Sequence, residues 1–156
     1  MSGIVGGAGS RSGVIGVAKH EVASQSWHIF PLGTVTISSA VLDFDGVRHM
    51  GNRITESGGR ITVLDAGLYW IGCRISKDNN SGVDLSIKLR IDGTEIEGTR
   101  MYTEFGTGEP YYLGQQGSWT VPLNAGQIID MYGSCRSYGG GSTNSMTWFS
   151  GARIGA

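Results

Sequence analysis

The chain has 156 residues, of which 39% are hydrophobic and 16% are charged, and its formal net charge is -1. This length suffices for one domain with its own core and is short for two, and the near-neutral charge argues against a nucleic-acid-binding surface. Glycine is unusually common at 27 residues, but it lacks the three-residue period of collagen. Glycines scattered between short β-rich runs indicate many tight turns in an all-β fold.

Membrane insertion is not expected, because no stretch is apolar over the length that a membrane helix needs. The N-terminus also lacks the charged-then-apolar layout of a signal peptide. Two cysteines, Cys73 and Cys135, are too few for a disulfide framework. We expect both to be small buried side chains in a reduced compartment, although the sequence leaves open whether they are bonded to each other.

The first 19 residues form a glycine- and serine-rich arm, which precedes a β-domain predicted for residues 20–156. Alone, this arm cannot bury enough apolar surface to offset its backbone entropy. It is therefore either a flexible tail or an arm that becomes ordered against a partner chain, for example by adding a strand. The residues expected to anchor it are Ile4, Val5, Arg11, Val14 and Ile15.

The first predicted strands follow the arm. Trp27 and Ile29 alternate with polar residues, and the nearby Pro31 favours an edge strand. Residues 33–38 form a clean alternating strand. Asp45-Gly46, with hydrophobic residues on both sides, predicts a hairpin turn.

Residues 61–76 are the most informative stretch, because a β-run breaks at Asp65-Ala66-Gly67 and then resumes. In a strand, alternate side chains point to opposite faces. One face of the second run is apolar and reads as core: Tyr69, Ile71, Cys73 and Ile75. The other face combines Leu68, Trp70, Gly72 and Arg74. Such a face suits contact with another protein chain, where aromatic residues and arginine are enriched.

The second half of the chain continues the β pattern. Residues 85–91 give the strictest period-two run, and Asp92-Gly93 predicts a turn after it. Further strands are predicted at residues 111–113, 119–121, 127–132 and 147–154, with turns at 114–117 and 124–126. No helical periodicity of useful length appears. Eight to ten short antiparallel strands indicate a β-sandwich or jelly roll.

Four segments in this order resemble the tumour necrosis factor (TNF) and complement component 1q globular-head superfamily. They are residues 61–75, 85–95, 109–127 and 147–154. The resemblance spans about residues 25–156 and implies a jelly roll of about ten strands that forms homotrimers. Gln127 departs from the pattern, in which an aspartate usually follows the glycine.

The same resemblance implies that the strand at residues 68–75 belongs to the sheet that packs around a threefold axis. The candidate interface residues are then Trp70, Arg74, Tyr111, Tyr112, Trp119 and Trp148. The alternative is an ordinary sandwich core with some exposed aromatic residues.

The arm carries a separate resemblance. Residues 9–16 are similar to short N-terminal segments of bacteriophage tail and head fibres. This similarity implies a virion protein that is assembled in the host cytoplasm and contacts other virion proteins through residues 1–19.

No pattern in the sequence predicts catalysis, and we expect no enzyme activity, cofactor or metal. The histidines His20, His28 and His49 fall into no catalytic or zinc motif. Asp43 and Asp45 do not continue into a calcium-binding loop. There is also no phosphate-binding glycine loop ahead of a predicted helix.

Two functions follow from these observations. The first is a non-enzymatic bacteriophage structural protein, a trimeric jelly roll attached to the capsid or tail through its arm, as a head or tail fibre or decoration protein. The alternative is a carbohydrate- or receptor-binding module of the TNF and complement 1q type. In that case loops bearing Tyr102 and Tyr138 would contact a glycan or protein on a host surface. The two functions can coexist in one protein.

Overall fold

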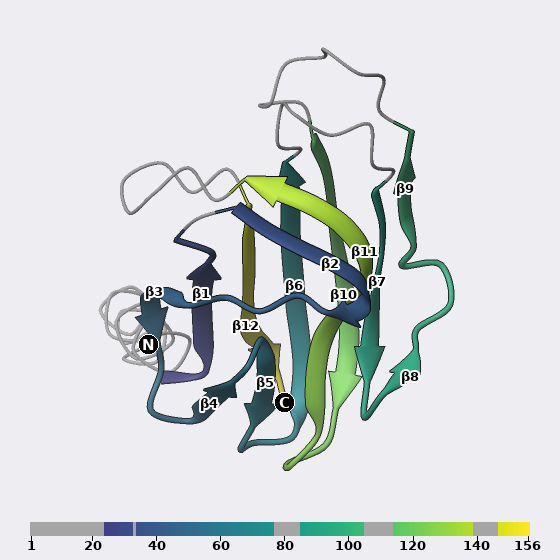
Figure 1. The fold of residues 1–156 in the computed structure, drawn as a ribbon. Coiled ribbons are helices and arrows are strands. Elements are labelled where there is room, and N and C mark those ends of the chain that lie inside the picture. Colours follow the sequence, from purple (N-terminus) through teal and green to yellow (C-terminus); the bar gives the residue numbers. More distant parts are fainter. Residues whose placement is uncertain (1–23, 33, 77–84, 105–113, 139–146) are drawn as a thin grey trace, which may run out of the picture.

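The protein is an all-β sandwich of two antiparallel sheets (Figure 1). The computed structural model describes residues 24–32, 34–76, 85–104, 114–138 and 147–156. These residues contain twelve strands, more than the eight to ten expected, because several are shorter than five residues. The predicted fold class is confirmed. Within the described residues no helix is long and apolar enough to cross a membrane.

The first sheet, sheet A, has five strands in the order β10-β6-β12-β1-β3. Their bounds are β1 (Ser26–Phe30), β3 (Gly46–Met50), β6 (Gly67–Ser76), β10 (Gly114–Leu123) and β12 (Trp148–Gly155). Strands β6 and β10 pair over ten residues each. Strand β1 lies between β12 and β3, so the prediction of an edge strand there was wrong. Its last residue is Phe30, so Pro31 lies outside the strand and interrupts no ladder.

The second sheet, sheet B, has seven strands, five of them in the order β4-β5-β11-β7-β8. Those five are β4 (Ile54–Ser57), β5 (Arg60–Val63), β7 (Leu85–Ile91), β8 (Thr94–Glu95) and β11 (Ile128–Tyr138). The other two are β2 (Thr34–Val41), which pairs with β11, and β9 (Met101–Thr103), which pairs with β7. The long strand β11 thus organises this sheet.

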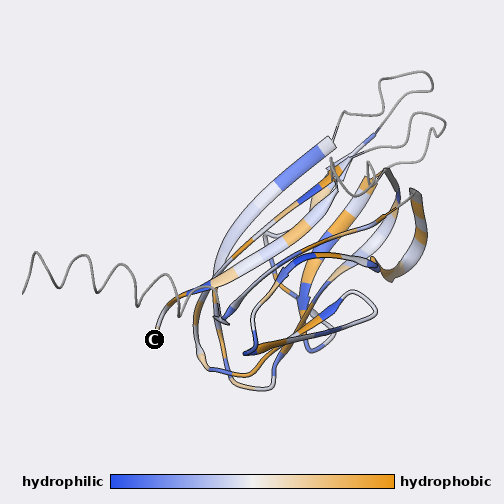
Figure 2. Ribbon diagram, turned by 90° about the vertical axis from the view of Figure 1, so that its left-hand side faces the viewer, coloured by the Kyte–Doolittle hydropathy of each residue, from blue (hydrophilic) through white to orange (hydrophobic). Residues whose placement is uncertain are grey.

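The core lies between the two sheets. Along individual strands, hydrophobic and hydrophilic segments alternate (Figure 2), as expected when one face of each sheet is buried. Sheet A contributes large aromatic side chains, and Phe149 makes an edge contact with Trp27 (centroids 5.6 Å apart) and stacks on Phe44 (5.8 Å). Sheet B contributes aliphatic residues such as Ile61, Leu89 and Ile129, none of which has exposed surface.

Of the two predicted hairpin turns, the one at Asp92-Gly93 is confirmed and the one at Asp45-Gly46 is wrong. Asp92 and Gly93 both have positive φ (50° and 79°) and join β7 to β8, as a primed hairpin turn requires. Asp45-Gly46 does not form the predicted hairpin, because β2 pairs with β11 in sheet B and β3 pairs with β1 in sheet A. Residues 42–45 instead cross between the sheets, with Leu42 and Phe44 buried.

The predicted turn at residues 114–117 is also wrong. Gly114 through Gly117 pair in register with Ser76 through Cys73 and form the first part of β10. Tertiary packing overrides the local glycine signal here. The indole of Trp119 covers Gly117 and takes the space of a missing side chain, since a Cβ there would lie 2.6 Å from that ring.

Gln127, the departure from the TNF-like pattern, has a structural role. Its side chain donates to Asp92 (2.9 Å) and accepts from the Asn124 backbone N–H (2.8 Å). The other Asp92 carboxylate oxygen accepts from the Ile128 N–H at 2.9 Å. The amide therefore joins two neighbouring turns, because it donates and accepts at once.

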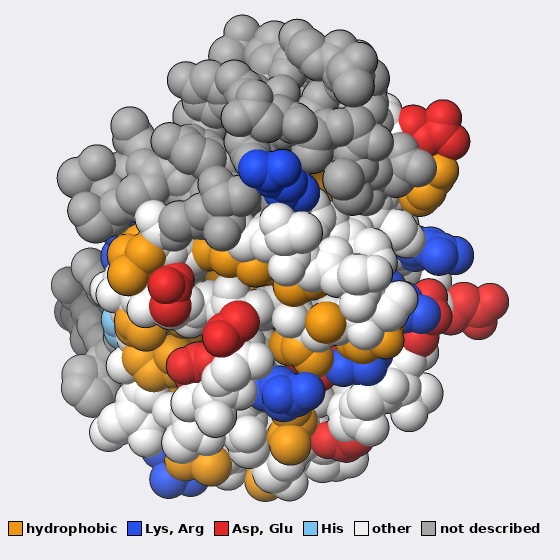
Figure 3. All heavy atoms as spheres, in the orientation of Figure 1, with side chains coloured by type: hydrophobic (Ala, Val, Ile, Leu, Met, Phe, Trp, Pro, Cys, Tyr) orange, Lys and Arg blue, Asp and Glu red, His pale blue; other side chains and the backbone are white. Residues whose placement is uncertain are grey.

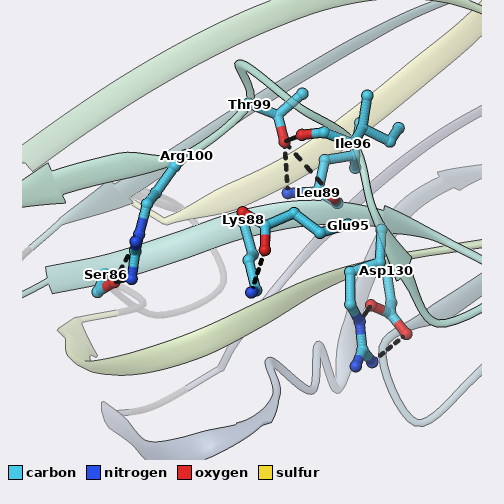
Figure 4. Close-up of polar contacts among 9 residues, drawn as sticks. Ser86, Lys88, Leu89, Glu95, Ile96, Thr99, Arg100 and Asp130 are labelled. Atoms are coloured by element: carbon cyan, nitrogen blue, oxygen red, sulfur yellow. Dashed lines mark hydrogen bonds and ion pairs between the residues drawn. The ribbon is translucent and has the colours of Figure 1, made fainter.

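The outer face of sheet B carries ion pairs. Arg90 makes two hydrogen bonds to Asp130 (2.7 and 2.8 Å), and Lys88 pairs with Glu95 (Figure 4). The Arg90 guanidinium lies 3.9 Å from the centroid of the Tyr132 ring. These contacts, with hydrogen bonds to Asp130 first among them, raise the pKa of Arg90. Acidic and basic side chains are mixed with hydrophobic ones on the face that Figure 3 shows.

Both cysteines are free and buried, which confirms the prediction that they are small core side chains. The Cys73 thiol contacts the Met101 sulfur at 3.8 Å. Burial raises the pKa of Cys73 to about 12.

We therefore expect Cys73 to resist alkylation in the folded protein. At pH 8 about one thiol in ten thousand would be ionised, and the thiolate is the reactive form. Mass spectrometry after maleimide treatment should show no label at Cys73 until urea is added. A cysteine introduced at the exposed Thr55 should react within minutes under the same native conditions, and equal labelling of the two sites would contradict the expectation.

Candidate functional site

The candidate site is the outer face of sheet A, the side of this sheet that faces away from the core. Antiparallel pairing places directly opposed residues on the same face, so the register defines the face row by row. One row across it contains Ser118, Gly72, Ser150, His28 and His49. The row on one side contains Thr120, Trp70, Ala152 and Ser26. The row on the other side contains Gln116, Arg74 and Trp148.

Gly72 determines the shape at the middle of this face. A Cβ at Gly72 would lie 2.7 Å from the Trp70 indole and 3.3 Å from that of Trp148. The two tryptophans therefore lean over a position without a side chain. Between them and β10 lies a hollow of about 300 Å³, lined by Trp70, Cys73, Gln116, Gly117, Ser118 and Trp148. Packing across the sheet thus explains why a glycine stands between two aromatic residues.

The face exposes apolar surface to solvent. Trp70 is 38% exposed and Leu68 is 37% exposed, although both belong to the long central strand β6. Ile154, near the end of β12, is 54% exposed. Clustered exposed hydrophobic residues of this kind mark interaction sites.

The charge on sheet A is of one sign. The sequences of its five described strands contain no aspartate and no glutamate. Their charged and titratable residues are Arg48, Arg74, Arg153, His28 and His49, with the tyrosine Tyr69 and cysteine Cys73 buried. Aromatic residues and arginine with few carboxylates are typical of the centre of a protein–protein interface.

His28 was not predicted as a site residue, yet it lies on this face beside Trp148. Its Nδ1 shares a hydrogen bond with the Ser150 hydroxyl at 2.6 Å, and its ring stacks on Trp148 (centroids 6.0 Å apart). Burial lowers the pKa of His28, and the nearby charges of Arg48 and His49 lower it further. The alternation of Trp27, His28 and Ile29 was the only sequence signal that could have placed it opposite the core.

The arrangement has no catalytic geometry among the described residues. No three histidine, cysteine, aspartate or glutamate side chains there come together as a metal site would need. The hydrogen-bond partner that the structure gives His28 is the hydroxyl of Ser150, and no carboxylate of the described strands of sheet A orients that pair. The face offers contact surface.

Comparison with solved structures gives matches over most of the chain. Eiger TNF from S. frugiperda has a TM-score of 0.58 at 17% identity, with 83% of this chain and 92% of that chain covered. Murine APRIL (0.56, 15%, 83% and 98%) and rabbit GITRL (0.52, 13%, 83% and 93%) match similarly. The fold is a TNF-like jelly roll. No protein-family model matches the sequence, and comparison with curated proteins gave no significant match.

The TNF-like fold confirms the resemblance stated for residues 25–156. Within it, the expected interface residues Trp70, Arg74 and Trp148 share the outer face of sheet A. Trp119 does not, because it is paired with Ile71 and packs against the core. The alternation of β10 places it on the opposite side from Thr120. Tyr111 and Tyr112 lie outside the described residues.

The remaining predicted positions divide in the same way. Tyr102 is 51% exposed on β9, and its hydroxyl donates to Glu104 at 2.8 Å. Tyr138 is the last residue of β11, but the structure does not describe its side chain. The arm residues Ile4, Val5, Arg11, Val14 and Ile15 precede the first described residue. A ligand-binding role for the loops and an anchoring role for the arm therefore stay predictions.

Proposed function

We propose that this protein is a non-enzymatic binding module of the TNF and complement 1q type that acts as a homotrimer. Its subunits would meet through the outer face of sheet A. The observation that supports this most is the exposure of Trp70 and Leu68 on an interior strand of a sheet whose described strands contain no aspartate or glutamate. In a monomer these side chains would stay in water, whereas an interface would bury them.

Loops at the ends of the sandwich would then contact a surface glycan or protein, with Tyr102 as the described candidate. Tyrosine contributes a rigid aromatic surface and a hydroxyl at low entropic cost. The virion role rests on residues 1–19, which lie outside the described residues, and no comparison supports it. Of the two predicted functions, the fold therefore favours the binding module.

The trimer is tested by native mass from light scattering on the full chain. Three chains of 16.5 kDa give about 50 kDa. Trp70→Ala and Arg74→Glu should each lower this mass toward 16.5 kDa, because the first removes buried apolar contact and the second places an unpaired carboxylate at the interface. A monomeric wild-type protein, or an unchanged trimer in both variants, would contradict the assignment.

Tyr102→Ala is the matched control, because it also removes an exposed aromatic residue but lies on sheet B. It should remain a trimer. If Tyr102 contacts the ligand, this variant should also bind less to glycan arrays or to cell surfaces. Retained binding would exclude Tyr102 from the contact surface and leave the trimer unaffected.

A further inference from the structure

The environment of His28 favours its neutral form over its charged form. Its Nδ1 is engaged with Ser150, while its Nε2 is buried and has no hydrogen-bond partner among the described residues. The ring stacks on Trp148 and lies 6.4 Å from the Phe30 ring. A protonated imidazole donates from both ring nitrogens, so its Nε2–H would lack an acceptor among the described residues, and a buried charge without a partner is costly.

Among the residues that the structure describes, the groups that surround His28 offer no counter-charge. From β3, Arg48 and the paired His49 face it, and both oppose its protonation. From β12, the facing side chains are Trp148 and Ser150, neither of which titrates. On its own strand the same-face neighbours are Ser26 and Phe30, also neutral. The next strand, β6, adds the cation Arg74 in the row of Trp148.

His28 also lies in the row that crosses the proposed interface. Its row runs through Ser150 and Gly72 to Ser118, which lines the hollow together with Trp70 and Trp148. Covering this face with another subunit would remove more water from His28. Further desolvation disfavours the charged form still more.

We propose that the outer face of sheet A is an acid-sensitive interface between copies of this chain, in which protonation of His28 separates the subunits. This inference rests on the proposed trimer. His28 is neutral at pH 7.5 and allows the face to be covered. As the pH falls, each subunit gains a positive charge on a face whose described strands hold arginines and no aspartate or glutamate.

The sign follows from the pKa of His28, which lies below its ordinary value of 6.5. This value belongs to the free subunit, and covering the face would lower the pKa of His28 further by desolvation. Protonation then favours the free subunit, so assembly is strongest above the free subunit's pKa and weakens as the pH falls below it. If the trimer depresses the pKa by one unit more than the monomer does, each site weakens assembly about tenfold in acid. Three sites together would weaken it about a thousandfold.

The test measures native mass by light scattering at pH 7.5 and pH 5.0, with circular dichroism at both pH values to follow folding. The full-length wild type should be a trimer of about 50 kDa (3 × 16.5 kDa) at pH 7.5 and a folded monomer at pH 5.0. His28→Asn keeps a polar group near the Nδ1 position and cannot be protonated, so it should remain a trimer at both values. His28→Gln serves the same purpose if the asparagine variant does not fold.

A permanent charge gives the converse test. His28→Lys should be monomeric even at pH 7.5, whereas Thr55→Lys, an exposed position on β4 of the other sheet, should not change the mass. A wild-type trimer that persists at pH 5.0 overturns the inference and leaves the proposed function standing. Acid dissociation that is unchanged in both neutral variants, or that accompanies loss of the fold, also overturns it. A wild-type monomer at pH 7.5 overturns the trimer itself.

Discussion

Asp130→Asn should lower the free energy of unfolding by about 3 kcal/mol, as expected when one partner of a buried ion pair is removed. The Asp130 side chain is only 4% exposed, and both carboxylate oxygens accept hydrogen bonds from Arg90. Asparagine has one acceptor oxygen and turns an amide donor toward the guanidinium. Arg90, with 16% of its side chain exposed, is then left charged and largely desolvated.

Urea denaturation at one fixed protein concentration measures this change, because an oligomer makes stability depend on concentration. Glu95→Gln is the matched control. It removes the partner of Lys88 on the same sheet, but Glu95 is 41% exposed, and exposed pairs contribute about 0–1 kcal/mol. Equal losses in the two variants would show that burial does not set the strength of the Arg90 pair.

Replacing both Arg90 and Asp130 distinguishes two costs: the loss of the attraction between them, and the burial of one charge without its partner. Replacing Arg90 and Asp130 together by leucine should recover part of the loss, since no charge is then left buried. If the double variant is as unstable as Asp130→Asn, the attraction between Arg90 and Asp130 exceeds the cost of burying their two charges, and the pair gives net stability. Arg60, whose Nε lies 3.8 Å from Asp130 and which is half exposed, stays solvated in either case.

The sequence predicted the fold class because the β signal is local. The strict alternation of residues 85–91 and the turn at Asp92-Gly93 reappear in β7 and β8 without change. These features depend on neighbouring residues only, so one chain suffices to see them. The sheet that carries Trp70 was predicted differently, through the resemblance of the four ordered segments to the TNF and complement 1q superfamily.

The errors arose where distant strands decide the local structure. Gly114 to Gly117 read as a turn, but pairing with β6 and the cover of the Trp119 ring make it a strand. Asp45-Gly46 read as a hairpin, but its two flanking strands belong to different sheets. A turn signal states that the chain can bend, and only tertiary pairing decides whether it does.

The candidate site was predicted only in part, because the sequence shows alternation within one strand but not the register between strands. Alternation along β6 placed Trp70 and Arg74 on one face, because both are on a single strand. It could not place His28 in the row of Gly72, since β12 lies between their strands. It also could not exclude Trp119, whose orientation depends on the register of β10.

Gly151→Ala should destabilise the protein by about 3 kcal/mol, at the upper end of the usual range for overpacking a core. A Cβ at Gly151 would lie 2.2 Å from the ring of Trp27, its paired residue on β1. Trp27 is 2% exposed and is held by Phe149 at 5.6 Å and Tyr69 at 6.4 Å. The ring has no free space to move into, because interiors are close-packed.

Gly155→Ala on the same strand separates this effect from a general intolerance of side chains in β12. A Cβ at Gly155 would lie 3.5 Å from Leu68, which is ordinary contact, and we expect a change within about 0.5 kcal/mol. Thermal unfolding of both variants gives the comparison. In a Trp27→Leu background, Gly151→Ala should cost less stability than it does in the wild type, because the smaller side chain leaves room for the methyl group. An equal cost in the two backgrounds would show that the collision is not the cause.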